Sequence, residues 1–257
     1  MEVYVVDTFT QNAFRGNPTG VVLVDHPVDP QWMQAVAAEM NHPATVFTDI
    51  SSAKAQPMTL CWFSPITELA LCGSGTLAAA HILGGDQVFQ APGGTLHCTT
   101  GSDGAISMRF PADPPHPEPQ TPELAEALPG ITVRSVWRGR HDVLVEADCA
   151  AEVRALVPNP RVLANIPARA VIATAAGDRE ADIVSRVFAP SAGIVEDPVT
   201  GSAHCTLANW WSERLGKPEL LAEQASQRGG LLRTRVEGDH VVLTGHAVTV
   251  CSGNLHV

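Results

Sequence analysis

Short apolar runs, many of them β-branched and bounded by glycine or proline, make up most of the chain. Runs of this length and composition predict β-strands rather than helices. We expect strands at Met1–Val6, Thr19–Val24, Thr45–Asp49, Met58–Phe63, Gly94–Thr99, Ala105–Phe110, Val133–Arg138, Asp142–Glu146, Ala170–Thr174, Val184–Phe188, Leu231–Val236 and His240–Thr244.

A helical pattern is confined to a few segments. In Asp29–Met40, Asp29 can serve as N-cap, and Trp32, Val36 and Met40 recur at helical spacing to form an apolar stripe. Further helices are expected at Pro122–Ala127, Ala150–Val157 and Ala203–Leu215. The pattern as a whole indicates an α+β protein that is rich in sheet.

The segment Pro111–Pro122 interrupts this pattern with six prolines in twelve residues. Proline lacks the N–H that a sheet interior or a helix requires, so the segment predicts an extended linker. We expect one domain over residues 1–112 and a second over 113–257, with the last strands able to cross back to the first domain.

A short repeat links the two halves. Phe63-Ser-Pro65 is followed by Gly-Ser-Gly-Thr-Leu-Ala ending at Ala78, and Phe188-Ala-Pro190 is followed by Gly-Ser-Ala-His-Cys-Thr-Leu-Ala ending at Ala208. Both copies predict a strand, a Gly-Ser turn and an Ala-rich helix, as in a duplicated domain. The N-terminus of such a helix can bind a carboxylate or phosphate. The alternative is two ordinary glycine-containing turns.

Composition and charge narrow the classes of function. The chain has 257 residues, 45% of them hydrophobic, and a net charge of -11 without a basic block, which argues against a nucleic-acid partner. No apolar run reaches the length of a membrane span, and the first residues lack the basic flank of a signal peptide, so a cytoplasmic protein is expected. Six cysteines contain no C-x-x-C pair, so no metal site is predicted and most are expected to be small buried thiols.

Two segments combine residues that can carry chemistry. In Glu196–His204, Asp197 precedes a predicted helix N-terminus, where a carboxylate suits proton transfer beside a bound anion; the alternative is that Asp197 and Thr200 only cap and turn the chain. Cys72, at the start of the matching helix, could act as a base or nucleophile, or it could be a small buried thiol.

Several motifs together resemble the PhzF family, which is related to diaminopimelate epimerase. The motifs occur in family order and spacing from residue 7 to about residue 245. They are Asp7-Thr-Phe9, Gly16-Asn-Pro-Thr-Gly-Val-Val22, Phe63-Ser-Pro65, Leu71-Cys-Gly73, Thr76-Leu-Ala-Ala79, Phe188-Ala-Pro190, Glu196–His204 and Gln224-Ala-Ser-Gln-Arg-Gly-Gly230.

The resemblance implies a diaminopimelate epimerase-like fold with two similar domains, each a β-barrel-like sheet around a central helix, and an active site in a cleft between them. It also implies a cofactor-independent isomerase that moves a proton. Asp197 and Ser202 match the family's second-half aspartate and serine.

The chain departs from the family pattern at two positions. The position of the family's catalytic glutamate falls on Ala44, and that of its first-half histidine falls on Ser74. An alanine cannot carry a proton, so either another group replaces the glutamate or the reaction needs one acid/base. The nearest candidates in sequence are His42, Cys72 and His204.

The sequence therefore predicts an isomerase that moves a proton or double bond on a small, carboxylate-bearing, unsaturated amino-acid-like substrate, in secondary (antibiotic-type) metabolism. The alternatives are an amino-acid epimerase that uses Asp197 and Cys72, and a degenerate protein that only binds a small acid. We expect no cofactor, no membrane partner and, as the one candidate protein partner, a second copy of the chain in a homodimer. The candidate catalytic residues are Asp197, Ser202 and Cys72, and the candidate substrate contacts are Asn17, Gly73, Ser74, Gly75, Thr76, Thr200, Gly201, Ala203, Arg228 and Gly229.

Overall fold

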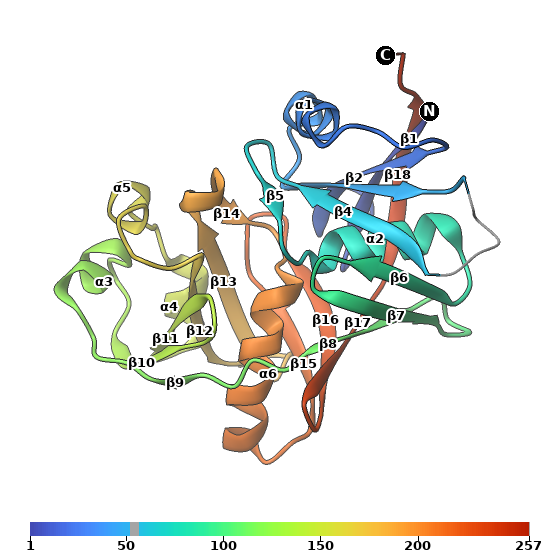
Figure 1. Cartoon of the computed structure of the whole chain (residues 1–257). Coiled ribbons are helices and arrows are strands. Elements are labelled where there is room, and N and C mark those ends of the chain that lie inside the picture. Colours follow the sequence, from blue (N-terminus) through green and yellow to red (C-terminus); the bar gives the residue numbers. More distant parts are fainter. Residues whose placement is uncertain (52–56, 257) are drawn as a thin grey trace. The chain divides into compact units, whose positions relative to one another are not determined.

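The computed structural model describes residues 1–51 and 57–256, which form two compact units (Figure 1). The first unit runs from Met1 to Phe110 and takes up the chain again from Val242, and the second runs from Pro111 to Val241. Among the described residues, no helix combines the length and the apolar character needed to cross a membrane.

The first unit is a sheet that winds around one helix. Its strands are β1 (Glu2–Thr8), β2 (Asn17–Val24), β3 (Ala44–Asp49), β4 (Met58–Phe63), β5 (Glu68–Leu69), β6 (Gln87–Ala91), β7 (Gly94–Thr100), β8 (Ile106–Pro111) and β18 (Ala247–Asn254). The central helix α2 (Gly73–Leu83) packs on β1, β2, β3 and β18, and every residue from Gly73 to Ala80 is buried. Helix α1 (Pro30–Met40) covers the outside, where Met33, Val36 and Ala37 pack with Phe47 and Phe63.

The second unit has the same kind of construction. Its strands are β9 (His116–Pro117), β10 (Val133–Arg138), β11 (Asp142–Ala147), β12 (Ala170–Ala176), β13 (Ile183–Ala189), β14 (Ile194–Asp197), β15 (Glu219–Gln224) and β16 (Gly230–Glu237), with β17 (His240–Gly245) spanning the change to the first unit. The central helix α6 (Gly201–Leu215) packs on β15 and β16. Three short helices, α3 (Pro122–Ala127), α4 (Ala150–Ala155) and α5 (Pro160–Leu163), and the turn η1 (Pro190–Ala192) complete the unit.

The two units pair their strands in the same order. In the first, β1–β2 is antiparallel, β2–β3 parallel, β3–β4 and β4–β5 antiparallel, β4–β6 parallel and β6–β7 antiparallel. In the second, β10–β11, β11–β12, β12–β13, β13–β14, β13–β15 and β15–β16 follow the same sequence of orientations. In each unit, the central helix follows the fifth strand of this pattern, which is β5 in the first unit and β14 in the second. The short sequence repeat is therefore part of a repeat of the whole topology.

The Pro-rich segment is more ordered than a simple linker. His116 and Pro117 form β9, which pairs with the edge of β10, where a proline can be accommodated because no further strand needs its N–H. The carboxylate of Asp113 accepts hydrogen bonds from Arg140 N (2.8 Å) and Thr206 Oγ1 (2.7 Å). These bonds fix the start of the second unit to its own central helix, so the segment expected to be an extended linker is held against the second unit.

Candidate functional site

The turn between β14 and α6 holds the aspartate singled out by the sequence. Asp197 is the last residue of β14 and pairs with Val187 of β13, and Pro198, Val199 and Thr200 lead from it into the helix. The Thr200 hydroxyl donates a hydrogen bond of 2.6 Å to Oδ2 of Asp197. The Asp197 side chain is half-buried, so a carboxylate with a fixed orientation lies three residues before the N-cap of α6.

Gln224 ties this turn to β15. Its side-chain amide donates to the Asp197 carbonyl (2.6 Å) and to Thr200 Oγ1 (3.3 Å), and its amide oxygen accepts the Thr200 N–H (2.8 Å). Gln224 is fully buried. The sequence placed this residue in a family-like motif but not among the site residues, and no local signal would have revealed contacts across 24 to 27 positions.

A second anchor fixes β14 to β13. Arg186 donates to both carboxylate oxygens of Glu196, from Nε at 2.7 Å and Nη2 at 2.8 Å, and its Nη1 bonds to the Leu156 carbonyl. Such a two-pronged pair has a well-defined geometry. Glu196 directly precedes Asp197, so this pair holds the backbone from which the Asp197 side chain extends.

The first turn of α6 has amides that no N-cap side chain occupies. The Thr200 side chain makes no capping bond because its hydroxyl is directed to Asp197. The N–H groups at the start of a helix lack intrahelical acceptors and carry partial positive charge. Gly201 and Ala203 are buried and Ser202 is half-buried, and N–H groups at a helix start are of the kind that bind an anion.

The start of α2 differs in its capping. Cys72 is the N-cap, and its sulfur accepts the Gly75 N–H (3.3 Å) and lies 3.3 Å from Ser74 Oγ. Thr76 Oγ1 donates to the Cys72 carbonyl (2.8 Å). Cys72 is 8% exposed and Ser74 is 4% exposed. The predicted reactive thiol therefore lies at a helix N-terminus and is almost fully enclosed.

Gly75 is required by a close approach within the first unit. A Cβ built on Gly75 would lie 2.5 Å from Cδ1 and 3.0 Å from Nε1 of Trp62, which is fully buried on β4. Contacts this short do not occur between real side chains, so the indole ring occupies the space that any other residue at position 75 would need.

The remaining predicted substrate contacts are Asn17, Arg228 and Gly229. Asn17 is buried at the start of β2, where its carbonyl accepts the Thr8 hydroxyl (3.1 Å). Gly229 has a φ of 65° and donates its N–H to Ser226 Oγ (3.1 Å), and the same Oγ donates to the Pro198 carbonyl (2.8 Å). The half-buried segment with Arg228 and Gly229 is thus attached to the Asp197 turn.

The candidates to replace the family glutamate have different surroundings. Ala44 is 2% exposed at the start of β3 and supplies no acid or base. His42 is half-buried just before it. His204 is fully buried, its Nδ1–H donates to the Thr200 carbonyl (2.8 Å), and burial lowers its pKa to about 4. A histidine that is neutral and enclosed at pH 7 stabilises the helix start and does not suit proton transfer with a ligand.

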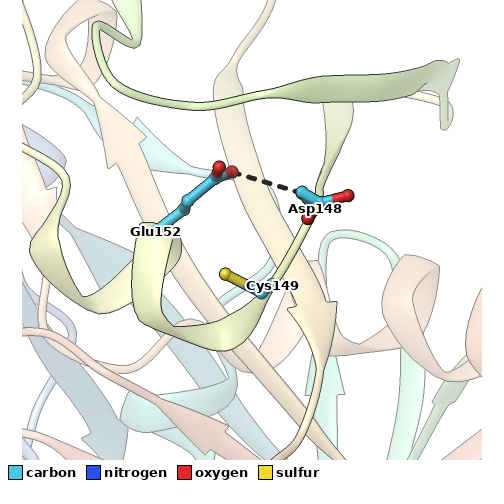
Figure 2. A group of neighbouring side chains, drawn as sticks. All are labelled: Asp148, Cys149 and Glu152. Atoms are coloured by element: carbon cyan, nitrogen blue, oxygen red, sulfur yellow. Dashed lines mark hydrogen bonds between the residues drawn. The ribbon is translucent and has the colours of Figure 1, made fainter.

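Cysteine thiols and carboxylates are ligand types that a metal can use. No disulfide joins the six cysteines, all of which lie in the described ranges, and burial raises the pKa of Cys98 and Cys205 to about 12. Asp148, Cys149 and Glu152 lie close together near the start of α4 (Figure 2). However, Glu152 accepts bonds from the Thr132 N–H and hydroxyl and from the Asp148 N–H, while Asp148 pairs with Arg134. These bonds identify the group as a helix-capping and ion-pair arrangement.

Comparisons with known proteins extend this picture. The model of the phenazine biosynthesis-like protein family matches residues 6–253. An uncharacterised isomerase of Halalkalibacterium halodurans is 42% identical, with 98% of this chain and 97% of the relative covered. The crystal structure of a PhzF-family phenazine biosynthesis protein from Enterococcus faecalis has a TM-score of 0.92 at 33% identity, covering 100% and 99% of the two chains.

A more distant match defines the fold alone. A probable proline racemase from Agrobacterium radiobacter superposes with a TM-score of 0.69 at 11% identity, over 100% of this chain and 93% of that one. This similarity confirms the expected diaminopimelate epimerase-like fold, and the family matches support a general role as an isomerase. The chain belongs to the phenazine biosynthesis-like (PhzF) family.

Proposed function

We propose that this protein is a cofactor-independent isomerase that moves a proton on a small carboxylate-bearing substrate, with Asp197 as the principal acid/base. The observation that carries the proposal is the fixed carboxylate of Asp197, which lies three residues before an N-terminus of α6 without a side-chain cap. A base and an anion-binding surface on one short segment are the two elements that proton transfer next to a carboxylate requires.

The first turn of α6 would take the negative charge in this reaction. The backbone N–H groups of Ser202 and Ala203 and the Ser202 hydroxyl can donate to the substrate carboxylate. When a proton leaves the neighbouring carbon, charge develops on the carboxylate as in an enolate, and donors fixed in advance stabilise that charge. Asp197 accepts the proton and returns it to another carbon of the same substrate.

The substrate class belongs to the same proposal. An unsaturated amino-acid-like compound has a proton whose removal is stabilised by both the carboxylate and the double bond, so one acid/base is sufficient to move the double bond. A single acid/base agrees with the presence of alanine at position 44. We place this reaction in secondary metabolism, where such precursors are modified.

Solvent deuterium incorporation into a panel of candidate compounds tests the assignment. The protein is incubated in D₂O with small α-amino acids and their α,β- and β,γ-unsaturated analogues, and proton NMR follows exchange at each carbon. Asp197→Asn keeps the shape of the side chain and should reduce exchange of the best compound by about 100-fold or more.

Asp148→Asn provides the matched control. It makes the same chemical change in the second unit, at an exposed aspartate that pairs with Arg134. This variant should exchange at the wild-type rate. Equal exchange by Asp197→Asn and wild type would reduce Asp197 to a structural residue, and binding of a compound without any exchange would favour the degenerate small-acid-binding protein.

An epimerase that also uses Cys72 is the second candidate. The observation that favours it is the sulfur of Cys72 at the start of α2, where it accepts the Gly75 N–H. An epimerase would invert a stereocentre, so chiral analysis of the exchanged compound distinguishes inversion from migration of a double bond.

A further inference from the structure

Three polar side-chain groups near α6 form a chain of hydrogen bonds with one direction. The Gln224 amide donates to Thr200 Oγ1 (3.3 Å), and the Thr200 hydroxyl donates to Oδ2 of Asp197 (2.6 Å). The hydroxyl is thus the donor and the carboxylate oxygen the acceptor, which is the arrangement that an ionised carboxylate requires. The Gln224 amide donates to the hydroxyl oxygen and so strengthens the hydroxyl as a donor.

Thr200 uses both of its donors inside the protein. Its N–H is bound by the Gln224 amide oxygen (2.8 Å) and its hydroxyl by Asp197. Neither group is therefore available to a ligand in this arrangement. This geometry points to a different role for Thr200 from the substrate contact that the sequence predicts.

The elements around this turn carry two ion pairs and a neutral histidine, and Arg228 lies in the segment that the Ser226 hydroxyl attaches to the Pro198 carbonyl. Glu196 on β14 is paired with Arg186 on β13. Glu223, next to Gln224 on β15, is paired with Arg154 on α4. His204 on α6 is neutral at pH 7, because burial lowers its pKa. The Thr200 hydroxyl is thus a neutral donor that acts on the Asp197 carboxylate at hydrogen-bond distance.

We propose that Thr200 and Gln224 are positioning residues that hold the Asp197 carboxylate ionised and in one orientation, ready to accept a proton. The inference rests on the proposed function for its catalytic meaning. The chain of hydrogen bonds from Gln224 through Thr200 to Asp197, here called the relay, can be tested without a substrate.

The substrate-free test is a carbon-13 NMR titration of the Asp197 carboxyl group. The protein is labelled with ¹³C-aspartate, and the signal is assigned by its loss in Asp197→Asn. Removing a donor from a carboxylate disfavours its ionised form, so Thr200→Val should raise the pKa of Asp197 by about 1. Thr200→Ser retains the hydroxyl and should titrate like wild type, whereas Gln224→Met should shift the pKa in the same direction by a smaller amount.

The kinetic test uses the compound of the D₂O panel that exchanges fastest. Thr200→Val should lower kcat by about tenfold with KM changed less than about twofold, because misplacement of the base affects the chemical step more than binding. Thr200→Ser should restore kcat. Melting temperatures verify that each variant is folded, and if Gln224→Met does not fold, the two Thr200 variants decide the question.

The outcomes separate this inference from the proposed function. If Thr200→Val leaves both the titration of Asp197 and kcat unchanged, or if Thr200→Ser does not restore them, the relay is overturned even where Asp197→Asn abolishes exchange. If Asp197→Asn exchanges normally while Thr200→Val still shifts the titration, the relay exists and the assigned function of Asp197 is wrong.

Discussion

The segments that lead into α2 and α6 occupy the same place in the two strand-pairing patterns but carry different residues. In the first unit, Leu69 lies three residues before the N-cap of α2 and pairs with Trp62. In the second, Asp197 lies three residues before the N-cap of α6 and pairs with Val187. An apolar side chain in one unit thus corresponds to the candidate acid/base in the other.

The support around these two positions differs in the same way. Gln224 is the last residue of β15, which runs parallel to β13. It corresponds to Ala91, the last residue of β6, which runs parallel to β4 in the first unit. The N-cap Thr200, whose hydroxyl bonds to Asp197, corresponds to Cys72, whose sulfur caps its own helix. The polar network belongs to the unit that has the carboxylate, so under the proposed function the repeated backbone supports proton transfer at Asp197 in the second unit.

In both central helices, a side chain in the first turn donates a hydrogen bond to the carbonyl of the N-cap residue. Titration of the donor in α6, His204, gives the largest expected effect on stability. His204 donates to the Thr200 carbonyl just as Thr76 donates to the Cys72 carbonyl, each at 2.8 Å. The pKa of His204 falls from 6.5 to about 4 on folding, so the unfolded chain binds more protons between these values. The contribution of neutral His204 to the free energy of unfolding is fully present above pH 6.5. It is lost as the pH falls toward 4, by on the order of 3 kcal/mol.

Urea unfolding at pH 7 and at pH 4 measures this loss. In His204→Thr, which copies the residue of the first unit, the part of the pH dependence that belongs to the histidine should disappear. An unchanged pH dependence in that variant would show that His204 does not titrate in this way and that the correspondence with Thr76 is misleading.

The third position of each central helix provides a smaller effect. Gly75 lies against Trp62, whereas the corresponding residue of α6 is Ala203. Gly75→Ala should destabilise the protein by about 2 kcal/mol, because the added methyl group overlaps the indole ring. Gly253→Ala, where a Cβ meets nothing within 4 Å, is the control and should change stability by less than about 1 kcal/mol.

Thermal or urea unfolding of the two variants measures the difference. If Gly75→Ala is as stable as Gly253→Ala, then Trp62 moves aside easily. The glycine would in that case not be required by packing.

The smallest expected effect concerns metal ions. Because the carboxylates of Asp148 and Glu152 are engaged in ion-pair and capping bonds, the protein should retain its exchange activity and melting temperature in EDTA. Metal analysis of the purified protein is the complementary measurement. A stoichiometric metal that EDTA removes together with activity would contradict a cofactor-independent reaction in either unit.

The sequence predicted the parts of the fold that depend on local pattern. The strands around Phe63 and Phe188 and the Gly-Ser starts of both central helices were expected, because apolar runs, prolines and glycines act within a few residues. The strand Glu219–Gln224 was not expected, since Glu-Leu-Leu-Ala-Glu-Gln has neither β-branched residues nor strict alternation. It forms because β13 and β16 offer it partners on both sides.

From the sequence, single residues of the candidate site could be predicted, but the contacts between them could not. Asp197 was identified from its place before a helix, and the resemblance gave it a role. Its contacts could not be derived, because the bonds from Gln224 and the pair Arg186–Glu196 join residues ten or more positions apart on different strands. Tertiary pairing, which a single sequence does not show, decides which carboxylate is held in place.

The most direct test of the central claim compares the two units in one assay. Asp197→Asn and Cys72→Ser change one atom each in the candidate acid/base groups of the second and first unit. Both are measured for deuterium incorporation into the fastest compound of the D₂O panel, beside wild type. We predict a loss of about 100-fold or more for Asp197→Asn and less than about tenfold for Cys72→Ser, in which the serine oxygen still caps α2. A loss of about 100-fold in Cys72→Ser with near-normal exchange in Asp197→Asn would assign the proton chemistry to the first unit and contradict this account.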